Sequence, residues 1–366
     1  MSEQLPSLDS LRNQIDEIDQ DIQRLLNARA ECAKQVADVK HAAAEKGETV
    51  VYYRPEREAQ VLRSVMERNK GPLNSETIAR LFREIMSACL ALEEPMKIAF
   101  LGPEGTFTQS AALKHFGHSV NTLSMTTIDE VFREVEAGAA HYGVVPVENT
   151  TEGMVNNTLD SFMESKLHIC GEVELRIHHH LLIGSATKSN AITRIYSHQQ
   201  SLAQCRKWLD AHYPSAERVA VSSNAEAARR LKDEWHAAAI AGETAAEIYG
   251  LEKFASNIED NPNNTTRFLI VSRSSVPASG IDKTSILVST KNKPGALHEL
   301  LDPFHKSGIS LTRIETRPAP NGNWAYVFFI DFEGHESNPA VQDVLTAIEQ
   351  KAVYVKRLGS YPKAVL

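Results

Sequence analysis

Residues 127–149 read TIDEVFREVEAGAAHYGVVPVEN, and residues 223–244 read SNAEAARRLKDEWHAAAIAGET. Each stretch begins with a capping box, the helix-start signature in which Ser or Thr is followed three positions later by Glu. Each continues through a helical pattern to a short apolar run that predicts a buried strand. The spacing from Thr127 to Glu148 is 21 residues, and that from Ser223 to Glu243 is 20. We predict two similar α/β lobes with a cleft between them; chance similarity of two β-α-β units is the alternative.

The residues around these two stretches fit the same α/β architecture. Lys97–Leu101 predicts a buried strand, and Gly102–Gly105 leads from it into a helix through Ala111 and Phe116. Strands and helices alternate from there to a Ser-, Pro- and Gly-rich linker at residues 272–280. Beyond the linker, the order strand, helix, strand, strand, helix, strand predicts a ferredoxin-like unit.

The N-terminal residues predict helices only. Apolar side chains recur at alternating spacings of three and four from Leu8 to Val39, which is typical of one long helix. Two shorter helices follow, one from Pro55 to Asn69 and one after Gly71-Pro72.

One position in the first helix breaks its apolar register. The pattern demands a hydrophobic residue at position 29, and the sequence has Arg29. A buried arginine needs an anionic partner, because an unpaired buried charge is costly. Lys40 lies eleven residues later, on nearly the same helix face. Arg57 and Glu93 on the other helices can reach this region, and a structural ion-pair cluster is what the charges alone favour.

Composition narrows the function classes. The chain has 366 residues, enough for two or three domains of roughly 150 residues each. A formal net charge of −8 argues against nucleic-acid binding, which usually needs a basic stripe. The N-terminus has no signal-peptide core, and no stretch approaches the ~20 apolar residues of a membrane span. These features predict a cytoplasmic protein with no nucleic-acid or membrane partner.

The positions of the cysteines and histidines give little indication of a metal site or of disulfide bonds. The four cysteines are far apart and form no C-x-x-C pair: Cys32, Cys89, Cys170 and Cys205. The run His178–His180 suggests metal ligands, but consecutive strand residues face opposite sides, so at most two could share a site. We therefore interpret this run as a strand that crosses between lobes, and we expect no metal.

The N-terminal motifs resemble the all-helical chorismate mutase family over residues 8–93. They are the pattern L-R-x-x-I-D-x-I-D at Leu11–Asp19, the run Leu26–Arg29, Lys40 and the pair Arg57-Glu58. The resemblance implies a pericyclic rearrangement, which needs a cationic pocket and no covalent step. It further implies the following roles: carboxylate binding by Arg12 and Arg29, donation to the ether oxygen by Lys40, lining of the site by Arg57, and binding of the ring hydroxyl by Glu58.

Three positions depart from that family's pattern. Arg54 replaces an acidic residue, Cys89 replaces a serine, and Glu93 replaces a glutamine near the ether oxygen. Geometry adds a constraint, because Arg12 and Arg29 lie about 25 Å apart along one straight helix. Both can touch one small molecule only if a partner chain supplies one of them. We therefore predict a homodimer or a higher homo-oligomer.

Four central motifs resemble the prephenate dehydratase family, in the expected order: Gly102–Phe107, Val145–Asn149, Ser197–Gln199 and Thr265–Phe268. The resemblance implies a two-lobed, periplasmic-binding-protein-like α/β domain that needs no cofactor. Thr266 would donate a proton to the leaving hydroxyl, and Arg267 would bind a carboxylate. The remaining pocket residues would be Thr106, Glu148, Asn149, Ser197, Gln199 and Phe268.

The C-terminal motifs Asn292–His298 and Ile314–Pro318 resemble the ACT-type regulatory domain. Such domains bind an amino acid between paired subunits, and here the resemblance implies phenylalanine as an allosteric inhibitor. The expected regulatory residues are Gly295, Ala296, Leu297, His298, Glu315, Thr316, Arg317 and Pro318.

Together these resemblances predict a bifunctional enzyme of phenylalanine biosynthesis with domains at residues 1–95, 96–275 and 281–366. Chorismate would be converted to prephenate, and prephenate to phenylpyruvate. A solute-binding sensor is one alternative, but it would need neither Thr266-Arg267 nor the Arg29/Lys40 face. A transcriptional regulator is another, but the acidic first helix lacks the features of a DNA-reading helix.

Overall fold

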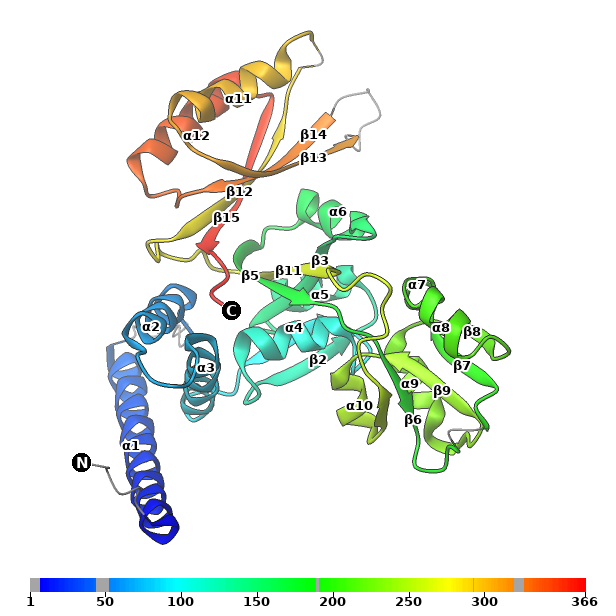
Figure 1. The fold of residues 1–366 in the computed structure, drawn as a ribbon. Coiled ribbons are helices and arrows are strands. Elements are labelled where there is room, and N and C mark those ends of the chain that lie inside the picture. The colour runs from blue at the N-terminus through cyan, green and yellow to red at the C-terminus, as the bar shows by residue number, and fades with distance from the viewer. Residues whose placement is uncertain (1–6, 44–52, 189–190, 292, 319–325) are drawn as a thin grey trace, which may run out of the picture.

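The computed structural model describes residues 7–43, 53–188, 191–291, 293–318 and 326–366. In chain order these form a helical region, two α/β lobes and a C-terminal sheet covered by two helices (Figure 1). The predicted multidomain fold is confirmed in each of these parts. None of the helices in the described ranges combines the length and apolarity that a membrane crossing requires.

The helical region consists of α1 (Leu8–Ala43), α2 (Pro55–Arg68) and α3 (Ser75–Ala91). Asn74 caps α3, because its side chain accepts a hydrogen bond of 2.7 Å from the backbone N–H of Thr77. Only the second half of α1 packs against α3, and Ala37 is its one buried residue. The first half of α1 projects away from the other elements (Figure 1).

The first lobe is built on a sheet of order β2-β1-β3-β11-β5, with β4 paired to β3. Its strands are β1 (Lys97–Leu101), β2 (Asn121–Met125), β3 (Tyr142–Asn149), β4 (Gly153–Met154), β5 (His168–Arg176) and β11 (Thr265–Ser272). Its helices are α4 (Phe107–Phe116), α5 (Ile128–Glu136) and α6 (Asn156–Glu164).

The second lobe has a sheet of order β10-β6-β9-β7-β8. Its strands are β6 (His180–Ile183), β7 (Arg194–His198), β8 (Glu217–Val221), β9 (Ala237–Ala241) and β10 (Glu252–Ala255). Its helices are α7 (Gln199–Gln204), α8 (Arg206–His212), α9 (Asn224–Arg230) and α10 (Glu243–Tyr249), with a short 3₁₀ turn at Leu231–Asp233.

The two lobes repeat one topology, as the paired sequence stretches predict. In each sheet three parallel strands have the spatial order second, first, third, and an antiparallel strand follows the third. The N-cap hydrogen bond forms in both, since Thr127 accepts from the backbone N–H of Glu130 at 3.2 Å and Ser223 from that of Glu226 at 3.0 Å. The glutamates do not bond back to the capping residues: Glu130 accepts from the backbone N–H of Thr126 at 2.8 Å, and Glu226 pairs with Arg229 at 2.7 Å. The lobes are joined by β5 leading into β6 and by β10 leading back to β11.

The C-terminal domain has the predicted ferredoxin-like order. It contains β12 (Asp282–Ser289), α11 (Ala296–Lys306), β13 (Leu311–Pro318), β14 (Tyr326–Glu333), α12 (Pro339–Lys351) and β15 (Tyr354–Pro362). The sheet order is β13-β14-β12-β15, and α11 and α12 cover one face of it.

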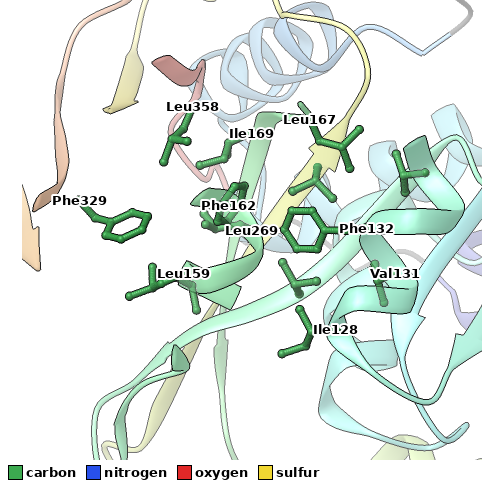
Figure 2. Packing of buried hydrophobic residues seen from close by; sticks show 14 of the residues in the cluster. Ile128, Val131, Phe132, Leu159, Phe162, Leu167, Ile169, Leu269, Phe329 and Leu358 are labelled. Atoms are coloured by element: carbon green, nitrogen blue, oxygen red, sulfur yellow. The ribbon is translucent and has the colours of Figure 1, made fainter. Parts of the chain in front are cut away.

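The other face of this sheet packs on the first lobe. Phe329 and Leu358 belong to the same buried cluster as Phe162 and Ile169 of that lobe (Figure 2). At Gly359 the two backbones meet, because a Cβ atom there would lie 2.4 Å from the carbonyl oxygen of Ile169. A continuous apolar core therefore holds the C-terminal domain against the first lobe.

Candidate functional site

A cleft of about 660 Å³ lies between the two lobes. Residues of both lobes line it, at the ends of strands and the starts of helices. Four of the residues expected from the sequence are among them: Thr106, Asn149, Thr266 and Phe268. A cleft with converging polar groups at strand ends is where an α/β protein usually binds a small ligand.

Thr266 is held in place by a neighbouring strand. It lies on β11 opposite Asn149 of β3, and the side-chain amide of Asn149 donates to the Thr266 hydroxyl oxygen at 2.7 Å. The Asn149 amide is itself fixed, because its oxygen accepts from the backbone N–H groups of Thr151 and Glu152 at 2.9 and 3.0 Å. With its oxygen thus occupied, the hydroxyl of Thr266 keeps its own hydrogen for donation to a molecule in the cleft.

A second network joins the two lobes across the cleft. Gln204 of the second lobe contacts the His179 ring at 2.8 Å and accepts from the Asn264 amide at 3.2 Å. Its own amide donates to Glu152 of the first lobe at 3.2 Å, and Gln200 donates to the same carboxylate at 3.1 Å. These side chains fix the relative position of the cleft walls.

His179 is a cleft residue that the sequence analysis missed. Burial lowers the pKa of its imidazole, so the ring is neutral at physiological pH. Its Nδ1 atom is buried and has no hydrogen-bond partner within the described part of the chain. The sequence of the three consecutive histidines predicts either metal ligands or a strand that crosses between lobes, and neither interpretation indicates a residue of the cleft. Among the described residues, no three His, Cys, Asp or Glu side chains are grouped so as to hold a metal.

Ser197 and Gln199 do not line the cleft. Ser197 is buried beneath it and donates to the carbonyl oxygen of Ile240 at 2.7 Å, with Asn224 as a second partner at 2.9 Å. Asn224 does line the cleft, so Ser197 supports a wall residue. Gln199 begins α7, and the next residue, Gln200, faces the cleft instead.

Glu148 and Arg267 lie on the opposite face of the sheet, which corrects the expectation that they contact substrate. The guanidinium of Arg267 pairs with Glu172 at 2.9 Å and with Asp331 of the C-terminal domain at 2.7 Å. Glu148 lies 3.5 Å from Arg313 of that domain. The reason is the alternation of side chains along strands: because Asn149 and Thr266 face the cleft, their neighbours face away.

The helical region brings some of its expected residues together. Lys40 on α1 lies close enough to Glu93 for its positive charge to act on that carboxyl. Burial nevertheless dominates and raises the pKa of Glu93, whose Oε2 atom is buried without a hydrogen-bond partner in the described residues. Cys89 is buried one helical turn before Glu93, and Arg29 is half-buried on α1.

Other expected residues of this region lie elsewhere. Arg12 sits at the projecting end of α1, exposed, with Asp9 at 3.7 Å. Arg57 is exposed on α2. Glu58 pairs with Arg83 of α3 at 3.1 Å rather than pointing to the Lys40 side, so its expected contact with a ring hydroxyl does not appear in one chain.

The expected regulatory residues flank the outer edge of the C-terminal sheet. Gly295 has φ +82 and precedes α11, which begins with Ala296, Leu297 and His298. Glu315, Thr316, Arg317 and Pro318 lie on the edge strand β13, and Arg317 pairs with Asp160 of α6 at 2.6 Å. Asn292 lies outside the described residues.

Comparison with known proteins places three families along the chain. Residues 11–94 match the model of chorismate mutase type II, residues 98–276 that of prephenate dehydratase, and residues 284–350 that of the ACT domain. A bifunctional chorismate mutase/prephenate dehydratase of Stutzerimonas stutzeri is 66% identical over 98% of both chains. Its counterpart from Aquifex aeolicus is 44% identical over 99% of both chains.

A solved structure agrees with the central and C-terminal parts. Prephenate dehydratase of Arthrobacter aurescens in complex with L-Phe is 36% identical, with a TM-score of 0.68. The match covers 73% of this chain and 90% of that one.

Proposed function

Because the chain belongs to the family of bifunctional chorismate mutase/prephenate dehydratases, we propose that its two reactions occur at the two sites described above. It rearranges chorismate to prephenate, and it dehydrates and decarboxylates prephenate to phenylpyruvate. We assign the second reaction to the interlobe cleft and the first to the helical region. The observation that carries the assignment of the cleft is the hydrogen bond between Asn149 and Thr266.

In the cleft, Thr266 acts as the proton donor. It protonates the ring hydroxyl of prephenate, which leaves as water, and the threonine then regains a proton from solvent. The ring carboxylate departs as carbon dioxide, and the electrons of its broken bond complete the aromatic ring. Aromatisation supplies the driving force, so one positioned donor of modest acidity suffices.

The substrate's negative charge is met by dipoles rather than by an arginine. Among the described residues that line the cleft there is no Lys or Arg. The wall does include the start of α4, where Thr106 precedes the first helical N–H groups, together with the hydroxyl residues Thr126 and Ser223. A helix N-terminus favours an anion, so we assign a substrate carboxylate to this end of α4.

In the helical region, the mutase site forms around Arg29, Lys40, Cys89 and Glu93. Cations there hold the carboxylates of chorismate and stabilise charge on the breaking ether oxygen. Glu93 takes part in its protonated form, as a hydrogen-bond donor to that oxygen. Its raised pKa supports this role.

A second copy of the chain completes this site. The projecting half of α1 exposes a row of large apolar residues, with Ile15, Ile18 and Leu25 each more than half exposed. A continuous apolar face of this kind usually marks a protein–protein interface. We assign it to a homodimer in which Arg12 of the partner subunit reaches the Arg29 side of the site.

Phenylalanine regulates the dehydratase through the C-terminal domain. This assignment rests on the ACT family match and on the L-Phe complex of the Arthrobacter aurescens relative. The left-handed turn at Gly295 lets a ligand approach the start of α11, whose N–H groups favour a carboxylate. Glu315 on the edge strand is the partner for the ligand's ammonium group.

The two activities should separate by substitution. Arg29→Ala should lower chorismate turnover by about 100-fold or more while sparing dehydration of supplied prephenate, because a carboxylate ligand is lost from one site only. Thr266→Ala should do the reverse, and Thr266→Ser should recover part of the activity because it keeps the hydroxyl. Steady-state assays of each reaction, with circular dichroism as the folding control, check this. Loss of both activities in a folded variant would contradict it.

Chorismate turnover should fall as the pH rises through the raised pKa of Glu93. The protonated carboxyl donates a hydrogen bond to the ether oxygen, whereas the ionised form repels the negative charge that develops there. Glu93→Gln should flatten the profile, since its amide donates at every pH. The pH profile of dehydration in the same variant is the control and should not move. An unchanged mutase profile in Glu93→Gln would remove Glu93 from the site.

Subunit mixing should reveal shared mutase sites. Arg12→Ala and Arg29→Ala should each be inactive with chorismate alone. When the two are co-expressed with different affinity tags, the mixed dimer should recover one intact site of its two, or about half the wild-type turnover per dimer. Purification through both tags isolates that species. If Arg12 and Arg29 of one chain served the same site, the mixed dimer would stay inactive.

Glu315→Gln should weaken phenylalanine inhibition. Loss of a charge-assisted hydrogen bond to an ammonium group should raise the half-inhibitory concentration by about tenfold or more. Prephenate dehydration is measured against phenylalanine concentration, and calorimetry measures binding directly. Glu349→Gln, an exposed carboxylate on α12 outside both motifs, is the matched control. Equal sensitivity of the two variants would place the ammonium partner elsewhere.

A further inference from the structure

Two neighbouring residue pairs on β3 and β11 face opposite ways. In the register of these strands Asn149 lies opposite Thr266, and Glu148 lies opposite Arg267. The first pair lines the interlobe cleft. The second pair points to the C-terminal domain. The cleft and the C-terminal domain are therefore contacted by adjacent residues of the same two strands.

The C-terminal domain presents a matching pair of charged residues that lie opposite each other on neighbouring strands. On β13 and β14, Arg313 lies opposite Asp331. Asp331 pairs with Arg267 at 2.7 Å, and Arg313 lies 3.5 Å from Glu148. Each cation of one sheet thus meets a carboxylate of the other. We call Glu148, Arg267, Arg313 and Asp331 the interdomain quartet.

Arg267 is the most constrained member of the quartet. It is buried, and its guanidinium contacts three groups that other residues hold in place: Glu172 at 2.9 Å, Asp331 at 2.7 Å and the Tyr361 hydroxyl at 3.0 Å. Ser285 donates to Asp331 at 2.6 Å and contacts Tyr361 at 2.8 Å. Two of the three partners of the guanidinium therefore belong to the C-terminal sheet.

Adhesion between the domains does not require these charges. The apolar cluster that contains Phe329, Leu358 and Ile169 already joins them (Figure 2). Burying an ion pair recovers little or no net stability compared with apolar residues of similar volume. A fork of directional hydrogen bonds does fix geometry, because a planar guanidinium accepts few orientations of its partners.

We infer that Arg267 is a positioning residue for Thr266, and that the C-terminal domain sets the geometry of the cleft through the interdomain quartet. This inference rests on the proposed role of Thr266 in dehydration. Arg267 is bonded directly to Thr266 along β11, so a shift of Asp331 and Tyr361 moves the Thr266 hydroxyl with it. The edge strand β13 carries Arg313 and also Glu315, the residue expected to bind phenylalanine. Phenylalanine bound to this strand can therefore shift Arg313 and, through it, the rest of the interdomain quartet.

The test uses the full-length chain with Asp331→Asn, which keeps the shape of the side chain and removes its charge. Asp331 lies in the C-terminal domain and does not line the cleft. We expect kcat for prephenate dehydration to fall by about tenfold or more while KM changes by less than about threefold, because a displacement near 1 Å is enough to impair proton transfer. Arg267→Lys should show the same split, since a lysine cannot reproduce the fork.

Phenylalanine response is the second readout. Arg313→Gln should lower the maximal inhibition by phenylalanine, and the exchanged pair Glu148→Arg with Arg313→Glu should restore it. Lys356→Met is the matched control, because Lys356 of β15 also joins the C-terminal domain to the first lobe, donating to the carbonyl oxygen of Phe162 at 2.8 Å, and shares none of the three partners of Arg267. It should keep both kcat and the inhibition within about twofold, as expected for a substitution whose effect is confined to stability.

The outcomes separate this inference from the proposed function. If Thr266→Ala retained full dehydration, the assignment of Thr266 would fail, and the quartet would lose its target. If Thr266→Ala were inactive but Asp331→Asn, Arg267→Lys and Arg313→Gln lowered only the melting temperature, Arg267 would be structural and this inference alone would be wrong. Equal losses of kcat in Lys356→Met and Asp331→Asn would also overturn it.

Discussion

Side chains alternate along β11, and this alternation links the cleft that we assign to dehydration with the C-terminal domain. Thr266 and Phe268 face the cleft, and Arg267 between them faces the C-terminal domain. A strand cannot rotate one of these residues without moving the others, because its backbone is fixed by β3 on one side and β5 on the other. The central position of β11 in the sheet makes it a stiff element through which one domain can act on another.

Sequence patterns were sufficient for the elements and their order. The matched capping boxes at Thr127 and Ser223 are local signals, and they correctly predict two lobes of one topology. Side-chain orientation was harder to obtain. The Thr265–Phe268 motif places Thr266 and Arg267 in one family pattern, which led to the expectation that both bind substrate. Alternation along a strand predicts instead that these two adjacent side chains face opposite sides of the sheet, as they do.

Three residues of the cleft could not be predicted from local sequence patterns, for a different reason. His179, Gln204 and Asn264 come from three segments that meet only when the second lobe folds against the first. Nothing local distinguishes Gln204 from other helix glutamines. Its importance arises from partners 25 and 60 positions away in the chain. Contacts of such sequence separation lie beyond any argument from periodicity or capping.

Arg267 and Glu93 differ in how the protein compensates for the burial of an ionisable group. In the interdomain quartet, Arg267 meets its partners within the protein, so the cost of burial is offset and the geometry is fixed. At Glu93 one carboxyl oxygen has no such partner among the described residues, and burial raises the pKa of the group. A buried oxygen atom without a hydrogen-bond partner is costly unless another group satisfies it. We propose that in the mutase site the ether oxygen of chorismate accepts a hydrogen bond from this carboxyl, for which the described residues offer no acceptor. This hydrogen bond is strongest in the transition state, when negative charge develops on the ether oxygen. An interaction that is stronger in the transition state than in the bound substrate accelerates the reaction.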